Sequence, residues 1–193
     1  DAFKPVTRYF DRITRPEQII QSFPTAVQTM LDPADCGPAV ISMSQDVQGE
    51  SYDYPEVFFE EKIHEIRRIS PDAVQIKKAV DLIKNSKQPI IISGGGVLYS
   101  EAEKELSNFA SKHNIPVVQT VMGFGSMLKD DPYNIGPVGG LGGKAANNIA
   151  KKTDLAIAIG TKLGDFTTGS WANFENPNFK LICLNATRFD STK

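Results

Sequence analysis

Apolar residues in this chain form short continuous runs, and between the runs they recur at the spacing of a helix face. A continuous apolar run is typical of a strand that is buried on both faces, and helices between such strands are typical of a parallel sheet. The connections are expected to be right-handed crossovers. We therefore expect an α/β protein whose strands occupy residues 38–43, 89–93, 115–120, 155–159 and 180–185.

The N-terminal part predicts the end of one α/β unit. The sequence TRPE from Thr14 to Glu17 fits a capping box, in which both side chains bind free backbone groups at a helix start. A helical period follows, but Pro24 interrupts it, and a proline inside a helix removes a hydrogen bond. We expect two short helices here, followed by the strand at 38–43.

The character of the sequence changes between residues 45 and 70. This stretch is charged and aromatic and has no clear period, as expected of a segment that crosses between two domains. We therefore expect three parts: the C-terminal part of one domain at 1–48, an interdomain linker at 49–70, and a second domain at 71–193 that could be truncated at its C-terminus.

Helix and strand alternate regularly in the second domain. Ser70 fits a helix cap with Pro71 at the first helical position, and the helix that follows would bury Ile76, Val80 and Ile83. A doubly wound parallel sheet with helices on both faces is therefore expected. Further helices are predicted at 100–114 and 144–152.

Glycines follow three of the predicted strands, in the sequences SGGG at 93–96, TVMGFG at 120–125 and GTKLGD at 160–165. Ligands of a doubly wound sheet bind outside the carboxyl ends of the strands, where these loops lie. Glycine lets a backbone approach a ligand closely, and helix starts offer free N–H groups to a phosphate. The same glycines could equally serve tight turns. Neither standard phosphate-binding fingerprint is present to decide between these two roles. GGGVLYS is not GxGxxG, and VGGLGGKAA lacks the first glycine and the Ser or Thr of a P-loop.

Composition and charge narrow the class of partner. Lysine and arginine number 21 against 23 acidic residues, and no basic cluster interleaved with aromatics stands out, so we expect no nucleic-acid partner. No apolar stretch reaches the length needed to cross a bilayer and no leader precedes the first helix, so we expect a soluble, cytoplasmic protein without a membrane partner. The two cysteines and two histidines are isolated, so we expect no metal site in this chain.

Residues 88–171 resemble the central domain of thiamine diphosphate enzymes such as acetohydroxyacid synthase. The matching features come in the same order: PIIISGGG, IPVVQT with MGFGSM, DPYNIGPVG and DLAIAIGT. Upstream, RPEQIIQSFPTAVQTMLDPADCGPAVISMSQDV is similar to the end of the pyrimidine-binding domain that precedes it in that family. The resemblance implies a Rossmann-like, DHS-type NAD/FAD-binding domain preceded by the terminal α/β piece of another domain.

A narrower resemblance concerns one branch of the family. The stretches FKPVTRYFDRITRPEQ, CGPAVISMSQDVQGESYDYPEVFF and HEIRR resemble trihydroxycyclohexane-dione hydrolases, the ring-opening enzymes of inositol catabolism. This resemblance implies a hydrolase of carbohydrate metabolism that uses thiamine diphosphate and Mg²⁺ to cleave a carbon–carbon bond of a cyclic 1,2-dione, giving a deoxy-glucuronic acid. Its partners would be the small-molecule dione, the remaining domains of the same enzyme, and further copies in a homo-oligomer.

The same resemblance implies that the catalytic machinery lies outside this chain. The cofactor-activating glutamate of the family belongs upstream of Asp1, and no residue here matches it. The Gly-Asp-Gly and Asn-Asn motif for Mg²⁺ and diphosphate is not matched, because GDF at Gly164 lacks the second glycine and Asn147 and Asn148 precede it. We therefore assign no catalytic residue and no metal ligand here, and expect the chain alone to be inactive.

Some relatives lay FAD or ADP across the glycine loops of the central domain. In the synthases a His-Gly pair and an arginine follow two of these turns, whereas this sequence has Leu141 and Lys162 there. Because the arginine that would bind a flavin phosphate is missing, FAD or ADP is doubtful and we expect an empty or only structural nucleotide site. The resemblance maps nucleotide contacts onto Gly94, Gly95, Gly96, Thr120, Met122, Gly123, Gly139 and Gly160.

Three hypotheses of function follow. The first is a fragment of a thiamine diphosphate hydrolase whose central domain holds the catalytic domains in register and helps to form the oligomer. The second is a stand-alone FAD- or ADP-binding module, which would purify with stoichiometric nucleotide. The third is an enzyme like acetohydroxyacid synthase, against which the linker sequence DYPEVFF and the missing arginine both argue.

Overall fold

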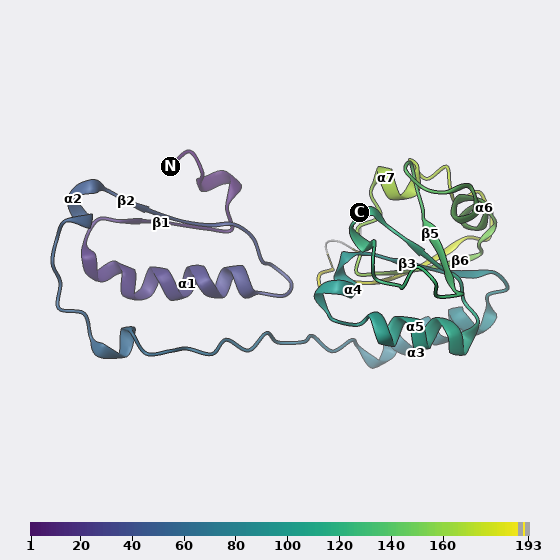
Figure 1. Cartoon of the computed structure of the whole chain (residues 1–193), viewed down its shortest axis with the longest axis horizontal. Coiled ribbons are helices and arrows are strands. Elements are labelled where there is room, and N and C mark those ends of the chain that lie inside the picture. Colours follow the sequence, from purple (N-terminus) through teal and green to yellow (C-terminus); the bar gives the residue numbers. More distant parts are fainter. Residues whose placement is uncertain (189–190, 192–193) are drawn as a thin grey trace. The chain divides into compact units, whose positions relative to one another are not determined.

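Figure 1 shows a computed structural model of the chain, which describes residues 1–188 and 191. The chain divides into two compact units, Asp1–Ser70 and Pro71–Lys193. The end of the predicted second domain, at 189–190 and 192–193, lies outside the described residues. Parallel strands form a two-stranded sheet in the first unit and a five-stranded sheet in the second, so the predicted α/β fold class is confirmed.

The first unit is built around a β–α–β arrangement. Its two strands pair in parallel from Tyr9 opposite Ala39 to Ile13 opposite Met43, and one long helix packs on them. Only Ile13 among the residues of these two strands is fully buried. The elements are η1 (Lys4–Val6), β1 (Tyr9–Ile13), η2 (Pro16–Gln18), α1 (Ile19–Leu31), β2 (Ala39–Met43), α2 (Gln45–Gln48) and η3 (Glu56–Phe58).

Helix α1 is continuous, so the prediction of two short helices divided at Pro24 is wrong. Pro24 has no N–H to donate to the carbonyl one turn earlier, which normally weakens a helix. On either side of it, however, Ser22 and Ala26 are buried. The Ser22 hydroxyl donates a hydrogen bond to Asp11 of β1, and this bond lowers the pKa of the Asp11 carboxyl. Packing against the strands therefore holds the helix together through the proline.

The predicted capping box of Thr14 and Glu17 is also wrong. The side chain of Gln18 accepts the backbone N–H groups of Thr14 (2.7 Å) and Arg15 (3.0 Å). A 3-10 turn that begins at Pro16 places Gln18, not Glu17, within reach of these donors.

The first half of the predicted linker folds within the first unit. Tyr54 donates a hydrogen bond to the carbonyl of Pro16 at 3.3 Å. Its ring stacks on Phe58 with centroids 5.8 Å apart and meets Tyr52 edge-on at 5.1 Å. Residues 61–70, in contrast, have no regular secondary structure and are exposed throughout. The extended part of the linker is thus shorter than the sequence suggests.

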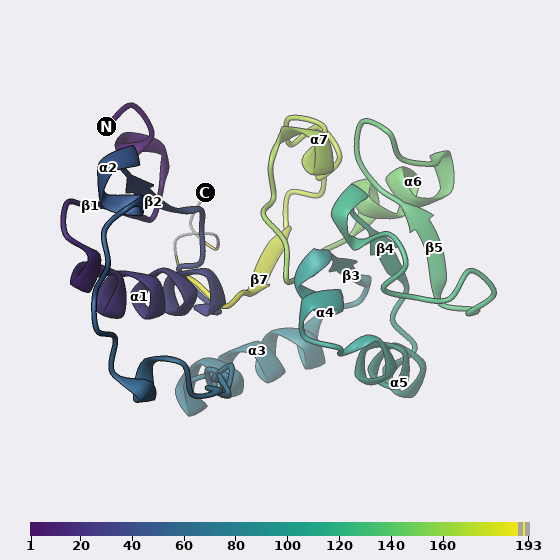
Figure 2. The ribbon, with the colours of Figure 1, turned by 60° about the vertical axis from the view of Figure 1, so that its left-hand side comes forward.

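The second unit is a parallel sheet covered on both faces. The strand order is β5-β4-β3-β6-β7, so the chain runs outward from β3 in one direction and then returns to continue from β6 in the other. Figures 1 and 2 show α3 and α5 on one side of the sheet and α6 on the other. The elements are α3 (Ala73–Asn85), β3 (Pro89–Ser93), α4 (Gly95–Tyr99), α5 (Glu103–His113), β4 (Val117–Gln119), η4 (Val121–Gly123), β5 (Asn134–Pro137), α6 (Lys144–Lys152), β6 (Leu155–Ile159), α7 (Asp165–Thr168) and β7 (Lys180–Leu184).

Alternate residues of the central strands fill two separate cores. Ile90 and Ile92 of β3 pack with Ala146 and Ala150 of α6 on one face. On the other face, Ile91 and Val117 pack with residues of α5, including Leu106 and Ala110. Both faces of the strands are apolar because both are covered, which explains the continuous apolar runs in the sequence.

The start of α3 differs from the prediction. Asp72, not Ser70, caps the helix, because its carboxylate accepts the N–H groups of Val74 (2.9 Å) and Gln75 (3.0 Å). The expected buried stripe is also only partly correct, since Ile76 and Val80 are exposed and the helix packs through Leu82 and Ile83 nearer its C-terminal end.

The sequence pattern does not predict five of the described α-helices and strands: β1, α2, α4, β5 and α7. β5 at Asn134–Pro137 lies inside a glycine-rich passage and includes Gly136 with a φ of +98°, so it carries no apolar run. The short helix α4 begins at Gly95, inside the triple glycine, where helix propensity is low. β5 and α4 are both short, so neighbouring elements stabilise them more than their own residues do.

Candidate functional site

The eight positions that the resemblance maps onto nucleotide contacts all lie at one edge of the second sheet. They occupy the loops and short helices that directly follow β3, β4, β5 and β6, at the carboxyl ends of the parallel strands. The structure therefore brings them together as the sequence predicted. They are Gly94, Gly95 and Gly96 after β3, Thr120, Met122 and Gly123 after β4, Gly139 after β5, and Gly160 after β6.

The loops after β3 and β6 meet where the strand order reverses, which is the usual ligand crevice of such a sheet. Here they are joined backbone to backbone. Gly94 N donates to Ile159 O and Gly96 N to Gly160 O, each at 2.9 Å. A β-carbon at Gly94 would overlap the Gly160 carbonyl, and one at Gly96 would lie 2.5 Å from the Gly160 α-carbon. Close contact between the two loops requires glycine at these positions.

The loop after β4 is fixed in a similar way. The Thr120 hydroxyl accepts the N–H of Gly123 at 3.1 Å, and Thr120 N donates to Ser93 O at 2.9 Å. A β-carbon at Gly123 would overlap the Ser93 carbonyl, and one at Gly95 would lie 3.0 Å from Met122 O. The loops after β3 and β4 therefore also pack tightly against each other.

The loop after β5 is held by Asn147 of α6. Its side-chain amide accepts from Gly139 N at 2.9 Å and donates to Gly139 O at 3.0 Å. Gly139 has a φ of +101° and leaves no room for a β-carbon beside the Phe166 carbonyl, and Gly140 N donates to that carbonyl at 2.7 Å. Asn147 thus has a structural role, and the loops after β5 and β6 touch.

A buried polar network, which no sequence motif predicted, lies beneath the loop after β4. Ser93, Gln119 and Ser126 are all fully buried. The Ser93 hydroxyl donates to Ser126 Oγ at 2.6 Å, while Gln119 Nε2 reaches Ser126 Oγ at 3.3 Å and Met127 O at 3.5 Å. Buried polar groups that satisfy one another in this way fix a single arrangement of the loop.

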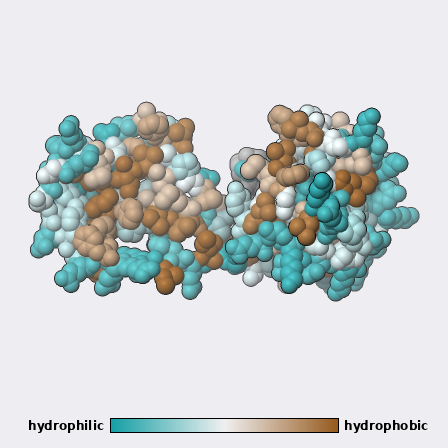
Figure 3. Space-filling view, viewed as in Figure 1, coloured by the Kyte–Doolittle hydropathy of each residue, from teal (hydrophilic) through white to brown (hydrophobic). Residues whose placement is uncertain are grey.

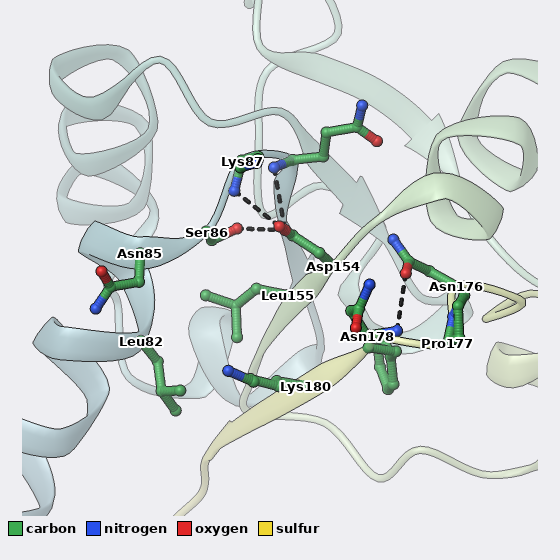
Figure 4. Close-up of a pocket in the computed structure, with 12 residues that line it drawn as sticks. Leu82, Asn85, Ser86, Lys87, Asp154, Leu155, Asn176, Pro177, Asn178 and Lys180 are labelled. Atoms are coloured by element: carbon green, nitrogen blue, oxygen red, sulfur yellow. Dashed lines mark hydrogen bonds between the residues drawn. The ribbon is translucent and has the colours of Figure 1, made fainter.

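A hollow of about 660 Å³ lies at the opposite, amino edge of the sheet (Figure 4). Asp154, which directly precedes β6, is its principal acidic group. Both carboxylate oxygens accept hydrogen bonds, from Ser86 Oγ (2.5 Å), Gln88 N (3.0 Å) and Lys87 N (2.8 Å). The lining residues are Leu82, Asn85, Ser86, Lys87, Gln88, Asp154, Leu155, Asn176, Pro177, Asn178, Phe179 and Lys180.

The hydrogen bonds to Asp154 keep its carboxyl group deprotonated. Burial raises the pKa of this carboxyl, but the three donors at Ser86, Lys87 and Gln88 outweigh burial, so the pKa lies below its ordinary value. The carboxylate is therefore charged at neutral pH and engaged by the chain itself. It ties the α3–β3 turn to the start of β6, and this arrangement supports a structural role rather than acid–base chemistry.

Neither edge presents a metal centre. Within residues 1–188 and 191, no group of three or more His, Cys, Asp and Glu side chains could hold a metal ion. In the same part of the chain, no helix is both long and apolar enough to span a membrane. Cys36 is exposed and Cys183 is half-buried, and both are free thiols.

The chain matches the family model described as thiamine pyrophosphate enzyme, central domain, over residues 76–193. Among curated relatives, the 3D-(3,5/4)-trihydroxycyclohexane-1,2-dione hydrolases of Clostridium perfringens (strain 13 / Type A), Clostridium botulinum (strain Alaska E43 / Type E3) and Bacillus thuringiensis (strain Al Hakam) are 48%, 45% and 42% identical to it.

Each of these matches covers 100% of this chain and 30% of the relative. The chain therefore spans about 30% of the length of the curated relatives it matches. The resemblance identified from the strand-and-glycine motifs is confirmed. The chain belongs to the thiamine pyrophosphate enzyme family, and its residues 76–193 match that family's central domain.

Proposed function

We propose that this chain is part of a longer, cytoplasmic enzyme that hydrolyses 3D-(3,5/4)-trihydroxycyclohexane-1,2-dione to 5-deoxy-glucuronate in inositol catabolism. The observation that carries the proposal is the identity of 42–48% along the whole chain to relatives that bear this hydrolase name. The similarity includes the first unit and the linker, which lie outside the part that the family model matches.

Within this enzyme, the chain acts as a scaffold. Thiamine diphosphate with Mg²⁺, when bound, would supply the carbanion chemistry that cleaves the carbon–carbon bond. The described residues do not fit these groups, because they form no carboxylate cluster for a metal and Asn147 is engaged with Gly139. The cofactor and substrate would therefore be held by the rest of the polypeptide, and the enzyme would work as a homo-oligomer.

The first unit supports the proposed domain division. A parallel sheet is normally covered on both faces, and a sheet of two strands is marginal by itself. Here one helix packs on two strands that remain largely half-buried, and Phe23, Met30 and Met43 are exposed. We assign residues 1–48 to the C-terminal part of the pyrimidine-binding domain, whose other strands and helices would complete this sheet, and residues 49–70 to the interdomain segment.

For the glycine loops we propose an empty or only structural nucleotide site. The close contacts of Gly94, Gly123 and Gly139 with neighbouring backbone account for glycine at these positions without a ligand. The loop after β6 carries Lys162 where the flavin-binding relatives are expected to carry arginine. FAD and ADP are therefore not assigned as cofactors of this enzyme.

The test is an assay of the full-length protein with thiamine diphosphate and Mg²⁺. We expect loss of the cyclic dione and formation of a carboxylic acid, followed by NMR, with no reaction when the thiamine diphosphate is left out. Pyruvate serves as the competing substrate. Formation of acetolactate without consumption of the dione would instead identify a synthase. Residues 1–193 alone should be inactive with either substrate.

A further inference from the structure

Six large apolar side chains are exposed at the carboxyl edge of the second unit. They come from the loops after β4, β5 and β6, and their exposed fractions range from 44% to 75%. We call them the carboxyl-edge surface: Val121, Met122, Phe124, Leu141, Phe166 and Trp171. Figure 3 shows hydrophobic residues gathered around α7, which carries one of these side chains.

The loops that carry these side chains are held in place. The buried Ser93–Ser126 hydrogen bond fixes the loop after β4 from below, and Met127 is 4% exposed in the same loop whose Met122 is 68% exposed. The hydrogen bond from Gly140 N to Phe166 O joins the loop after β5 to α7, next to Leu141. The loops that display the apolar side chains are therefore anchored to the sheet and to each other.

The composition of this surface is that of a protein interface. The segments 120–127 and 138–143 contain no charged residue, and the loop after β6 carries only Lys162 and Asp165 between Gly160 and Trp171. Aromatic residues and methionine are enriched, and charges depleted, at the centres of interfaces between proteins, while a large exposed apolar patch is unusual on a free surface. The hollow described above lies at the opposite edge of the sheet and is lined by other residues.

We infer that the carboxyl-edge surface is an interdomain interface, covered by the part of the same polypeptide that lies outside this chain. The inference rests on the proposed function. Because the 193 residues here make up 30% of the relatives, the full polypeptide has about 640 residues (193 divided by 0.30) and about 450 of them lie outside. A segment of that length forms further domains, and these are the partners available in fixed ratio to every copy of this surface.

The occupant is identified by cross-linking the full-length protein. Phe166→p-benzoylphenylalanine places a photoreactive group on the surface. The same substitution at Leu128 is the matched control, because Leu128 is 81% exposed but its carbonyl accepts a hydrogen bond from Asn134 at the start of β5, at the opposite edge of the sheet. Cross-links from position 166 should map by mass spectrometry to segments outside residues 1–193 of the same molecule. Cross-links to residues 1–70, cross-links between two molecules, or none above the control level would each overturn the inference.

A second experiment tests whether the carboxyl-edge surface is covered: the unsubstituted full-length protein is oxidised with hydrogen peroxide. Met122 should oxidise at least about tenfold more slowly than free methionine, approaching the rate of the buried Met127 of the same molecule. A rate equal to that of free methionine overturns the inference. Protection that is lost on desalting and restored by ADP or FAD overturns it too, because the occupant is then a nucleotide. Ring-opening activity of the same preparation reports separately on the proposed function.

Discussion

A β-carbon on Gly94 would overlap the carbonyl oxygen of Gly160, across the crevice where the strand order of the second sheet reverses. The backbone dihedral angles of Gly94 (φ −111°, ψ −177°) are ordinary extended values that any residue can adopt. The requirement for glycine therefore comes from the contact between two loops and not from the conformation of one.

Gly94→Ala should lower the free energy of unfolding by about 2–4 kcal/mol, because the two loops must separate to admit a methyl group. Gly95→Val should also destabilise the protein, since a β-carbon there lies 3.0 Å from Met122 O. Gly164→Ala is the control, because nothing lies within 4 Å of its β-carbon position. Thermal unfolding measures all three. An unchanged melting temperature for Gly94→Ala or Gly95→Val would contradict the assignment of these turns.

Ser126→Ala should destabilise the protein by about 1–3 kcal/mol, because it leaves the buried Ser93 hydroxyl and Gln119 amide short of a partner. Ser93→Ala combined with Ser126→Ala should cost less than the sum of the single changes, since the double variant leaves fewer polar groups unpaired. Ser111→Ala serves as the control, because its hydroxyl bonds only to Asn108 O at an exposed position. Chemical denaturation of the parent and the four variants gives the free energies of unfolding to compare. Additive losses would show that the network is not coupled.

Asp154→Asn should destabilise the protein at neutral pH by roughly 1–3 kcal/mol, because it removes the charge that three donors stabilise. The pKa of Asp154 is lowered in the folded protein, so its contribution is fully present above the ordinary value of 3.8 and is lost as the pH falls through the folded pKa. The difference between the parent and the variant should thus shrink below about pH 4. Urea unfolding at several pH values tests this. A constant difference from pH 7 to pH 3 would rule out the charged carboxylate as the cause.

The melting temperature should stay the same when ADP or FAD is added, as the proposal of an empty or structural nucleotide site requires. A ligand that binds the folded state raises the melting temperature by mass action, so concentrations up to about 1 mM detect even weak binding. Thiamine diphosphate with Mg²⁺ should shift the full-length protein but not residues 1–193. A shift of residues 1–193 with ADP or FAD would make the glycine loops a working nucleotide site.

The apolar pattern was sufficient to predict the sheet of the second unit. The runs at β3, β4 and β6 are continuous because both faces of each strand are covered, so residues on both faces are apolar. The edge strand β7 is only half-buried, but its central residues are apolar too. The pattern failed where the local sequence is weak. β5 contains a glycine with positive φ, and its pairing with β4 supplies the stability that its own residues do not.

Helix boundaries, too, were only partly predictable from the local sequence. Pro24 predicted a break in α1 because proline removes a hydrogen bond, yet the hydrogen bond from Ser22 to Asp11 and the burial of Ala26 keep the helix whole. Ser70 predicted a cap, but Asp72 lies where its carboxylate meets two free N–H groups. The cost of a proline inside a helix is about 3 kcal/mol, which tertiary packing can offset. The choice of Asp72 over Ser70 is a local one between two possible caps.

The order of residues along the chain was enough to predict the alternation of strands and helices and the family. The gathering of the glycine loops at one edge then followed from the parallel pairing of the strands. Only the tertiary structure decided what the glycines and polar residues do. Gly94 faces Gly160, Asp154 binds the turn at 86–88, and Ser93 at the end of β3 binds Ser126 in the loop after β4. These partners lie 33 to 68 positions apart along the chain, and no local pattern encodes contacts at that separation.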